Sequence, residues 1–324
     1  MRNQTELTGR RGSGRAGTRP VVWAALLAVT LVWSCVDYAN HGGSLNGPTG
    51  MTISAYGGIF LTDTGNNRII RMDNMQGGSW TPFGFLSTTV QLFNAPLGIA
   101  LDSANRIYIA DSGTNQVIRI ENMGGAGWIG FNGPALPAPP SPLSGPAGIA
   151  VDGDNKLYIA DAKNNRIVRI DDMTGTNWVA FGGPALDPFN TPTGVAVDAA
   201  RAIYVADAGN NRIVRMDDMS GTNWTTLGTA GSGMNQFLGP GGIAVTSAGR
   251  IEVTDTGNDR VVQIDDMIGT NWAALGAHGS GANHFNGPAG VAVDRSDAIY
   301  VADELNNRIV RMDDITGAGW ETFP

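Results

Sequence analysis

The chain contains only three histidines, and two of them, His278 and His284, lie close together in a glycine-rich stretch. The third, His41, lies in an N-terminal segment whose sequence is similar to that stretch. Imidazole and carboxylate groups are suitable zinc ligands, and either can act as a general base when it is held in place. We therefore take His278, His284, Glu252 and His41 as candidate ligand-binding residues. The identity of any metal or cofactor stays open.

An aspartate is followed five residues later by an arginine at five places in the chain. These pairs are Asp63 and Arg68, Asp161 and Arg166, Asp207 and Arg212, Asp255 and Arg260, and Asp303 and Arg308. At a sixth place the arginine is replaced by Gln116. A two-strand hairpin brings such positions face to face, where a charge-assisted hydrogen bond forms. Because a catalytic group does not usually recur in every unit of a repeat, we interpret these as structural pairs that lock a turn.

Neighbouring aspartates also recur, always before a turn, as Asp171-Asp172, Asp217-Asp218, Asp265-Asp266 and Asp313-Asp314. Adjacent carboxylates can attract calcium, but the alternating spacing that wraps a calcium ion is missing. We therefore expect solvated turns that keep one face of the molecule acidic.

The elements that position these residues follow from a repeat that begins near residue 46. Six tryptophans are separated by 48, 50, 46, 48 and 48 residues, and one aspartate and one glycine per copy keep the same intervals. The six copies span residues near 46–93, 94–143, 144–190, 191–238, 239–286 and 287–324.

Each copy contains four short apolar runs, as residues 192–228 show. PTGVAVD, AIYVAD, RIVRMD and NWTTLG are rich in Val, Ile and Tyr and are bounded by Gly, Asn or Asp, which is typical of strands. No stretch shows a sustained helical period. Four antiparallel strands per copy predict an all-β fold, a six-bladed β-propeller. The tryptophans begin the fourth, outermost strands, so we expect them to pack between blades.

Residues 279–313 (GSGANHFNGPAGVAVDRSDAIYVADELNNRIVRMD) resemble the NHL repeat, as do residues 156–171 (KLYIADAKNNRIVRID). The resemblance extends over essentially all of residues 46–324 in six copies. It implies a six-bladed propeller of the kind found in bacterial secreted and sensor proteins and in some animal RNA regulators. The resemblance does not imply one activity, because such propellers include both binding proteins and a few lyases.

The topology places the loops between blades and the turns between second and third strands on one face. Residues 132–146, 182–192 and 228–240 in these loops contribute one carboxylate, Asp187, and no basic residue. Such a surface suits a neutral or weakly polar partner, a peptide or a glycan. Residues 35–324 carry 16 basic and 28 acidic side chains, a net charge of −12, which excludes nucleic acid as a partner.

Copy 5 departs most from the pattern. Glu252 replaces an aromatic residue, Gln263 replaces an arginine, and Thr246 replaces an aspartate. The loop that follows holds His278 and His284. If the protein is an enzyme, we expect its site near this loop between blades 5 and 6.

Residues 1–35 resemble a bacterial lipoprotein signal. Five arginines precede an uncharged run at residues 21–34, which is too short to span a membrane as a helix. The run ends at Cys35, the only cysteine, and the resemblance implies cleavage before Cys35 and a lipid on its sulfur. The alternative is an ordinary signal peptide with a chance cysteine. Residues 36–45 are expected to pack beside blade 6 and help to seal the ring.

Three functions remain open at this stage. The first is an exported, lipid-anchored binding propeller of the cell envelope, at the outer membrane, periplasm or cell surface, with a soluble secreted protein as the alternative. The second is a metal-dependent lyase or hydrolase. The third is a structural module that docks envelope proteins through its acidic face. We expect a monomer that contacts a membrane only through an N-terminal lipid.

Overall fold

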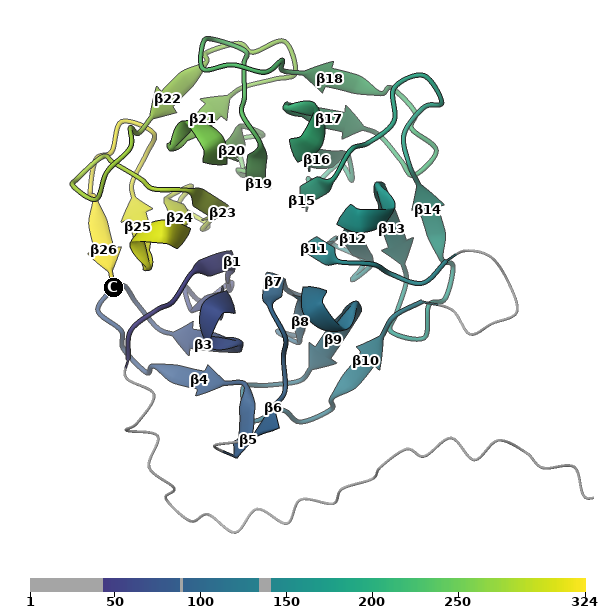
Figure 1. Ribbon diagram of the computed structural model, residues 1–324, viewed down its shortest axis with the longest axis vertical. Coiled ribbons are helices and arrows are strands. Elements are labelled where there is room, and N and C mark those ends of the chain that lie inside the picture. Colours follow the sequence, from purple (N-terminus) through teal and green to yellow (C-terminus); the bar gives the residue numbers. More distant parts are fainter. Residues whose placement is uncertain (1–42, 88–89, 134–140) are drawn as a thin grey trace, which may run out of the picture. The chain divides into compact units, whose positions relative to one another are not determined.

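The computed structural model describes residues 43–87, 90–133 and 141–324. Residues 44–324 form six four-stranded antiparallel sheets, arranged as blades around a central channel (Figure 1). The predicted all-β, six-bladed propeller is confirmed. The signal-like segment, Cys35 and His41 lie outside the described residues. Over the described part of the chain, no helix has the length and apolar character needed to cross a membrane.

Each blade is built from consecutive strands of one repeat. Blades 1 to 3 comprise β1 (Pro48–Ile53), β2 (Ile59–Asp63), β3 (Arg68–Met72) and β4 (Thr81–Phe83); β7 (Pro96–Leu101), β8 (Ile107–Asp111), β9 (Gln116–Ile120) and β10 (Ile129–Phe131); and β11 (Pro146–Val151), β12 (Leu157–Asp161), β13 (Arg166–Ile170) and β14 (Val179–Phe181). Blades 4 to 6 comprise β15 (Pro192–Val197), β16 (Ile203–Asp207), β17 (Arg212–Met216) and β18 (Thr225–Leu227); β19 (Pro240–Val245), β20 (Ile251–Asp255), β21 (Arg260–Ile264) and β22 (Ala273–Leu275); and β23 (Pro288–Val293), β24 (Ile299–Asp303), β25 (Arg308–Met312) and β26 (Glu321–Phe323).

Two further kinds of element lie between these strands. A small hairpin, β5 (Phe85–Ser87) and β6 (Val90–Gln91), separates blades 1 and 2. A short 3₁₀ turn joins the second and third strands of every blade. These turns are η2 (Thr64–Asn66), η3 (Ser112–Thr114), η4 (Ala162–Asn164), η5 (Ala208–Asn210), η6 (Thr256–Asn258) and η7 (Glu304–Asn306).

The second strand of each blade is buried along its whole length. A blade packs with both faces against its neighbours, so its inner strands read as nearly continuous apolar runs instead of alternating ones. The outer strands are only three residues long. Short outer strands leave little free edge for unwanted pairing with another chain.

The innermost strands meet at a ring of glycines around the channel. A Cβ on Gly50 would lie 2.1 Å from the carbonyl oxygen of Leu97 in blade 2. A Cβ on Gly290 would lie 2.1 Å from the carbonyl oxygen of Thr49 in blade 1. Six strands can converge this closely only without side chains at that level, which explains why this glycine recurs in every copy.

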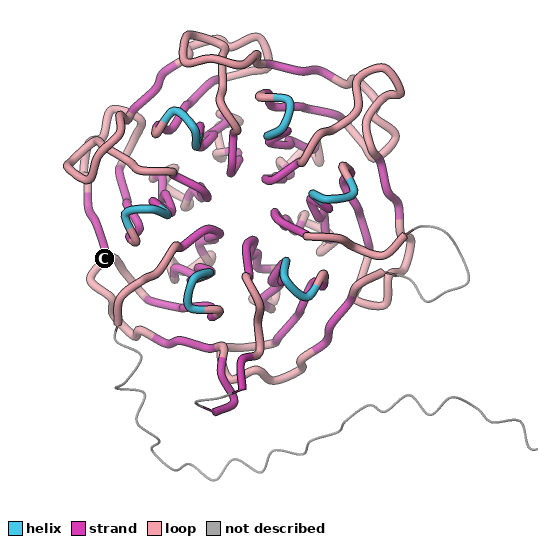
Figure 2. The backbone as a smooth tube through the Cα atoms, in the orientation of Figure 1, coloured by secondary structure: helices cyan, strands magenta, loops and turns pink. Residues whose placement is uncertain are grey.

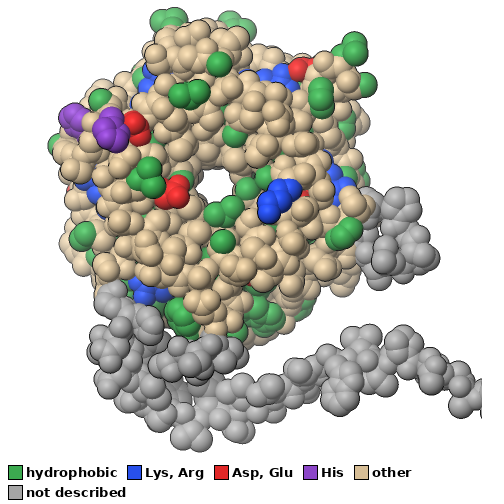
Figure 3. Space-filling model, viewed as in Figure 1, with side chains coloured by type: hydrophobic (Ala, Val, Ile, Leu, Met, Phe, Trp, Pro, Cys, Tyr) green, Lys and Arg blue, Asp and Glu red, His purple; other side chains and the backbone are tan. Residues whose placement is uncertain are grey.

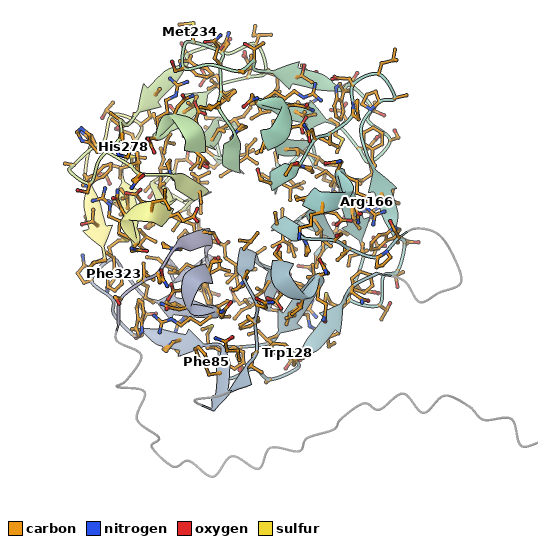
Figure 4. All side chains as sticks on the ribbon, in the orientation of Figure 1. Phe85, Trp128, Arg166, Met234, His278 and Phe323 are labelled. Carbon is orange, nitrogen blue, oxygen red and sulfur yellow. The ribbon has the colours of Figure 1, made fainter. Side chains whose placement is uncertain are left out.

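The ring closes without any exchange of strands between the first and last blades. Blade 6 is made only of residues that follow Gly287, and blade 1 only of residues that precede Gly84. The seam is a packed interface, in which Leu45 is 4% exposed and belongs to one apolar cluster with Tyr300 and Ala302 of blade 6. Phe323, labelled in Figure 4, stacks on Trp80 of blade 1 with ring centroids 5.3 Å apart.

Candidate binding face around the channel mouth

The inter-blade loops and the six 3₁₀ turns lie on one side of the ring, which we call the loop face. In blade 5 the backbone N–H of Gly257, within η6, donates to the carbonyl of Leu238 in the preceding loop at 2.8 Å. Figure 2 shows the six turns surrounding the channel. The opposite side, which we call the turn face, carries the turns after the first and third strands.

A side-chain oxygen ties each 3₁₀ turn to the next inter-blade loop, from an asparagine in five blades and from Asp259 in blade 5. Asn67 follows η2 with a left-handed backbone, and its Oδ1 accepts a hydrogen bond from the N–H of Ala95 at 2.7 Å. Asn307 follows η7 and accepts from the N–H of Gly47 at 2.8 Å, which joins the two ends of the ring. Asparagine suits this position because it tolerates the left-handed conformation. The loops are therefore held in fixed places.

The recurring aspartates are hubs that fix each loop to its blade. Asp207 is fully buried; its Oδ2 accepts from Arg212 Nε at 2.7 Å and from Asn210 Nδ2 at 2.8 Å, and its Oδ1 accepts from the N–H of Asn190 at 2.7 Å. The corresponding ion pairs in blades 1, 3, 5 and 6 measure 2.6 to 2.8 Å. Carboxylates buried in this way are occupied by their own loops and cannot touch a ligand.

Blade 2 shows what the missing arginine changes. Gln116 replaces it, and Thr114 donates to the Asp111 carboxylate instead. Burial raises the pKa of Asp111, although the bonds from Thr114 and from the N–H of Asn94 lower it. Among the described residues, no cation pairs with this carboxylate as Arg212 pairs with Asp207.

The recurring tryptophans fill the joints between blades. Trp224 lies against Phe189 of the preceding loop, at 5.0 Å between ring centroids, and against Phe181 of blade 3, at 5.9 Å. The Arg212 guanidinium carbon lies 5.8 Å from the Trp224 ring, a cation–π distance. Four other blades repeat this arrangement at 5.5 to 5.9 Å.

Most charge on the loop face is neutralised within the protein. Asp187, the single carboxylate of the three long loops, accepts hydrogen bonds from Arg212 and from Trp224 Nε1. Among the described 3₁₀ turns only Glu304 and Lys163 are charged, and no described residue pairs with the side chain of either. Figure 3 shows one acidic and one basic group on opposite sides of the open channel.

Exposed aliphatic side chains gather on the loop face of blades 3 to 6. Leu186 is 99% exposed, Met234 71%, Leu305 62% and Leu238 44%. Leu238 lies over Gly257 of η6, and Leu305 lies in η7. These side chains stand at separate points of the loop face, from the outer loops, where Figure 4 labels Met234, to the 3₁₀ turns around the channel.

The two histidines lie in the loop between blades 5 and 6, at residues 276–287. Nδ1 of His278 lies 3.1 Å from Oδ2 of Asp259, and the His278 side chain is 74% exposed. Asp259 occupies the position where the other five blades have asparagine, and its Oδ1 still accepts from the N–H of Gly287 at 2.7 Å. His284 Nδ1 lies 2.7 Å from the carbonyl oxygen of Ala282. Figure 4 places His278 toward the outer rim.

The preceding loop, residues 228–239, has the same backbone and no histidine. Ala230 and Gln236 stand where His278 and His284 stand 48 residues later. Arg260 donates to the carbonyls of Ser232 and Gln236, and Arg308 donates to the carbonyls of Ser280 and His284, at 2.6 to 2.9 Å. The histidines are therefore additions to a loop that forms without them.

The structure does not bring Glu252 to the histidines. Glu252 lies in β20 near the turn face, 0% exposed, and its Oε1 accepts from Gln263 Nε2 at 2.6 Å. Gln263, which pairs with Glu252, lies three residues along β21 from Arg260, about 10 Å, and Asp259 precedes Arg260 at the far end of that strand. No group of three or more potential metal ligands occurs within residues 43–324 as described.

The environment of Glu252 is unusual for a carboxyl group. Its Oε2 is buried without a hydrogen-bond partner, as is Nε of the nearby Arg250. Burial raises the pKa of Glu252 to about 7, although the hydrogen bond from Gln263 and the charge of Arg250 lower it. The group can therefore hold a proton near neutral pH, inside the interface between blades 5 and 6.

The acid pairs on the turn face are occupied within their own turns. Oδ1 of Asp218 accepts hydrogen bonds from the N–H and the hydroxyl of Ser220 at 2.8 and 2.6 Å. These bonds lower the pKa of Asp218 to about 2. Asp217 pairs with Arg215 at 2.6 Å and accepts from Asn223.

Reasoning from the sequence missed the two unpaired charges at the channel mouth. Aligning the six copies would have revealed them, because the first residue of the 3₁₀ turn is Glu304 in one copy and Thr, Ser or Ala in the others. Lys163 likewise stands at a position where four of the six copies have glycine. The missing information was that these positions surround the channel.

These features define a closed propeller whose loop face is held by repeated ionic and amide contacts. The family model for the NHL repeat matches residues 93–120, 143–170, 189–216 and 285–312. The chain therefore contains NHL repeats, arranged as the blades of a six-bladed β-propeller.

Blades 1 and 5 have the same fold, although the family model does not match them. They carry Thr62 and Thr254 where the others have alanine, and both hydroxyls donate to a carbonyl of the next blade, at 2.7 and 2.6 Å.

Solved structures with this fold have different activities. A catalytically inactive virginiamycin B lyase from Staphylococcus aureus, solved with quinupristin, is 18% identical, with a TM-score of 0.59, 87% of this chain covered and 86% of that chain. A nidogen/laminin complex matches at 18% identity and a TM-score of 0.60, with 79% of this chain and 90% of that chain covered. An auxiliary nutrient binding protein from Bacteroides thetaiotaomicron matches at 12% identity and a TM-score of 0.60, with 83% of this chain and 69% of that chain covered.

At these identities the matches show the fold alone. No match was found among curated proteins.

Proposed function

We propose that this chain is an exported, monomeric binding module that recognises a neutral peptide on its loop face. A lipid on Cys35 would hold it at the cell envelope. The observation that carries the proposal is the composition of the loop face, where most charged groups are paired internally and Leu186, Met234, Leu238 and Leu305 are exposed. The nidogen/laminin and nutrient-binding structures with this fold are consistent with a binding role.

The kind of exposed side chain favours a peptide over a glycan. Sugar rings stack on flat aromatic faces, and five of the six recurring tryptophans are half-buried between blades. The sixth, Trp128, is 40% exposed, but it directly precedes the outer strand β10, away from the channel mouth (Figure 4). Aliphatic side chains instead suit the apolar side chains of an extended peptide. We therefore commit to a peptide, and a glycan becomes an outcome of the test.

The test is a peptide array and a glycan array probed with the full chain. We expect neutral peptides with aliphatic residues to bind, and Leu238→Ser or Leu305→Ser to weaken the interaction about tenfold because buried apolar contact is lost. The matched control is Ile268→Ser, since Ile268 is 77% exposed in the turn after β21, on the turn face. Binding to glycans alone, or equal losses in all three variants, would contradict the proposal.

The anchor is tested separately from the binding. We expect the full chain to incorporate radiolabelled palmitate and to sediment with membranes, and Cys35→Ser to abolish both. A labelled Cys35→Ser variant, or an unlabelled native protein, would contradict lipidation and favour an ordinary signal peptide. Light scattering of detergent-solubilised protein tests the monomer.

A second candidate function is a lyase or hydrolase, which the contact between His278 and Asp259 favours. Hydrogen bonding of Nδ1 to a fixed carboxylate orients an imidazole and leaves Nε2 available as a general base. The test is elemental analysis of bound metal and a hydrolase and lyase screen. The matched variant is His278→Ala with His284→Gln, which copies the preceding loop. An activity or stoichiometric zinc that is lost in this variant would move the enzyme ahead of the binding module.

A further inference from the structure

The channel mouth carries two opposite charges on opposite sides. Lys163 lies in η4 of blade 3 and Glu304 in η7 of blade 6. Blades 3 and 6 are three positions apart in a ring of six, so the turns that carry the two residues lie on opposite sides of the channel (Figure 1). The other first residues of these turns are the small, uncharged Thr64, Ser112, Ala162, Ala208 and Thr256.

Neither charge is used by the fold. The structure places no ion pair or hydrogen bond from a described residue on the side chain of Lys163 or Glu304, whereas Asp161, Asp187 and Asp303 on the same face are all paired. The stem of Lys163 lies against Gly145, and Glu304 approaches Gly47. Glu304 is partly buried, and burial raises its pKa. A partly desolvated carboxylate without a partner is costly to the folded state.

The surroundings of Glu304 add an apolar contact. Leu305 follows it in the same turn, is 62% exposed, and lies over Gly287. An exposed aliphatic side chain therefore stands next to Glu304 in the same 3₁₀ turn. Lys163 has no such neighbour in its own turn, where Ala162 is buried and Asn164 donates to Asp161.

We propose that the channel mouth binds both charged ends of a short oligopeptide with free termini. Glu304 receives the terminal ammonium group, Leu305 contacts the first side chain, and Lys163 receives the terminal carboxylate. The inference rests on the proposed peptide-binding function and specifies which peptides are recognised. It does not depend on His278 or His284.

This arrangement of charges selects a ligand with an ammonium group at one end and a carboxylate at the other. A ligand with one charge would satisfy one residue and leave the other unpaired or repelled. A peptide with two free ends is neutral overall, which agrees with the otherwise neutral loop face, and aligns its dipole with the field across the mouth. The distance between the two residues then selects the length of the peptide.

The experiment uses the full chain and a series of peptides of two to five residues, each with an N-terminal leucine followed by alanines. Each peptide is prepared with free ends, N-acetylated, C-amidated and doubly capped, and its affinity is measured by calorimetry. We expect one length to bind best, and acetylation or amidation to weaken it about tenfold each, a typical effect of losing one paired charge at an interface.

The variants assign each end to one residue. In Glu304→Gln, free and acetylated peptides should bind equally, while amidation should still weaken binding. In Lys163→Gln the sensitivities should be reversed. Lys156→Gln is the matched control, because Lys156 lies in the turn after β11 on the turn face, and it should keep both sensitivities.

The outcomes separate the two proposals. If capped and free peptides bind equally, and neither variant changes this, the inference is wrong while peptide binding on the loop face stands. If no peptide binds in any form, peptide recognition itself is wrong, and the inference is overturned with it. If both variants lose affinity for every form alike, the residues are structural, and the assignment of the ends is overturned.

Discussion

Blades 4 and 5 have the same backbone and differ in one buried network. In blade 4 the hydroxyl of Tyr204 donates to Asp198 at 3.2 Å, and Arg215 lies beside it. In blade 5 the corresponding residues are Glu252, Thr246 and Gln263, and Oε2 of Glu252 has no partner. A charged network that satisfies itself has been replaced by a single carboxyl group. The fold therefore tolerates different polar interiors as long as the strands and the buried aspartate of the hub are kept.

The largest expected effect tests what the two blades share. Asp207→Ala and Asp255→Ala each remove a fully buried carboxylate. Arg260 then loses its ionic partner, and Arg212 loses one of its two, since it also pairs with Asp187. We expect each change to lower the free energy of unfolding by about 3–5 kcal/mol, measured by urea denaturation. A loss much smaller in blade 5 than in blade 4 would show that the hub is not equivalent in the two blades.

The next effect is a dependence of stability on pH, which we expect from blade 5 and not from blade 4. Because the pKa of Glu252 is raised to about 7 from an ordinary value of 4.5, the folded state favours the protonated form. This stabilisation is complete below about pH 4.5 and is lost as the pH rises through 7, at most about 3 kcal/mol. Glu252→Gln removes the charge and should be more stable than the native protein at pH 8.

The measurement is the melting temperature of the native protein and the variant between pH 4.5 and 8. Their difference should grow with pH. Tyr204→Phe in blade 4 is the matched control; it should cost about 1 kcal/mol for the lost hydrogen bond without changing with pH over this range. Parallel curves for native protein and Glu252→Gln would contradict a raised pKa.

A third prediction rebuilds the blade 4 network in blade 5. The combined change Thr246→Asp, Glu252→Tyr and Gln263→Arg supplies the Asp, Tyr and Arg of blades 2, 3, 4 and 6. We expect a gain of about 1–2 kcal/mol at pH 8, because a buried, unpartnered carboxyl oxygen is removed, and no residual pH dependence from this site. Calorimetric unfolding tests the gain. A large loss would show that the neighbouring blade has adapted to Glu252.

The smallest effect concerns the histidine loop. His278→Ala copies Ala230 of the preceding loop, and the side chain is 74% exposed. We expect the stability to change by less than about 0.5 kcal/mol, since exposed ion pairs contribute little. A loss above 1 kcal/mol would mean that the loop needs His278 to fold, which would weaken its use as a probe of activity.

Much of the fold could be predicted because each constraint repeats and acts locally. Asp207 and Arg212 are five residues apart and face each other across one hairpin, so their spacing alone indicates a pair. The same applies to strand length and turn chemistry in each copy. Aligning the copies identifies Glu252 as unusual. It does not give the distance between Glu252 and the histidines, because all three residues belong to one copy and only the folded blade shows that they lie at opposite ends of it.

The sequence by itself determined the number of blades, their strands and the residues that lock each turn, because contacts between neighbours in sequence need no knowledge of the whole ring. Only the tertiary structure decided which residues meet across it. Lys163 and Glu304 are 141 positions apart in the numbering, and their turns lie on opposite sides of one channel only because six blades close into one ring. Closure depends on the angle between packed blades. Many side-chain contacts together set that angle, and no single spacing in the sequence encodes it.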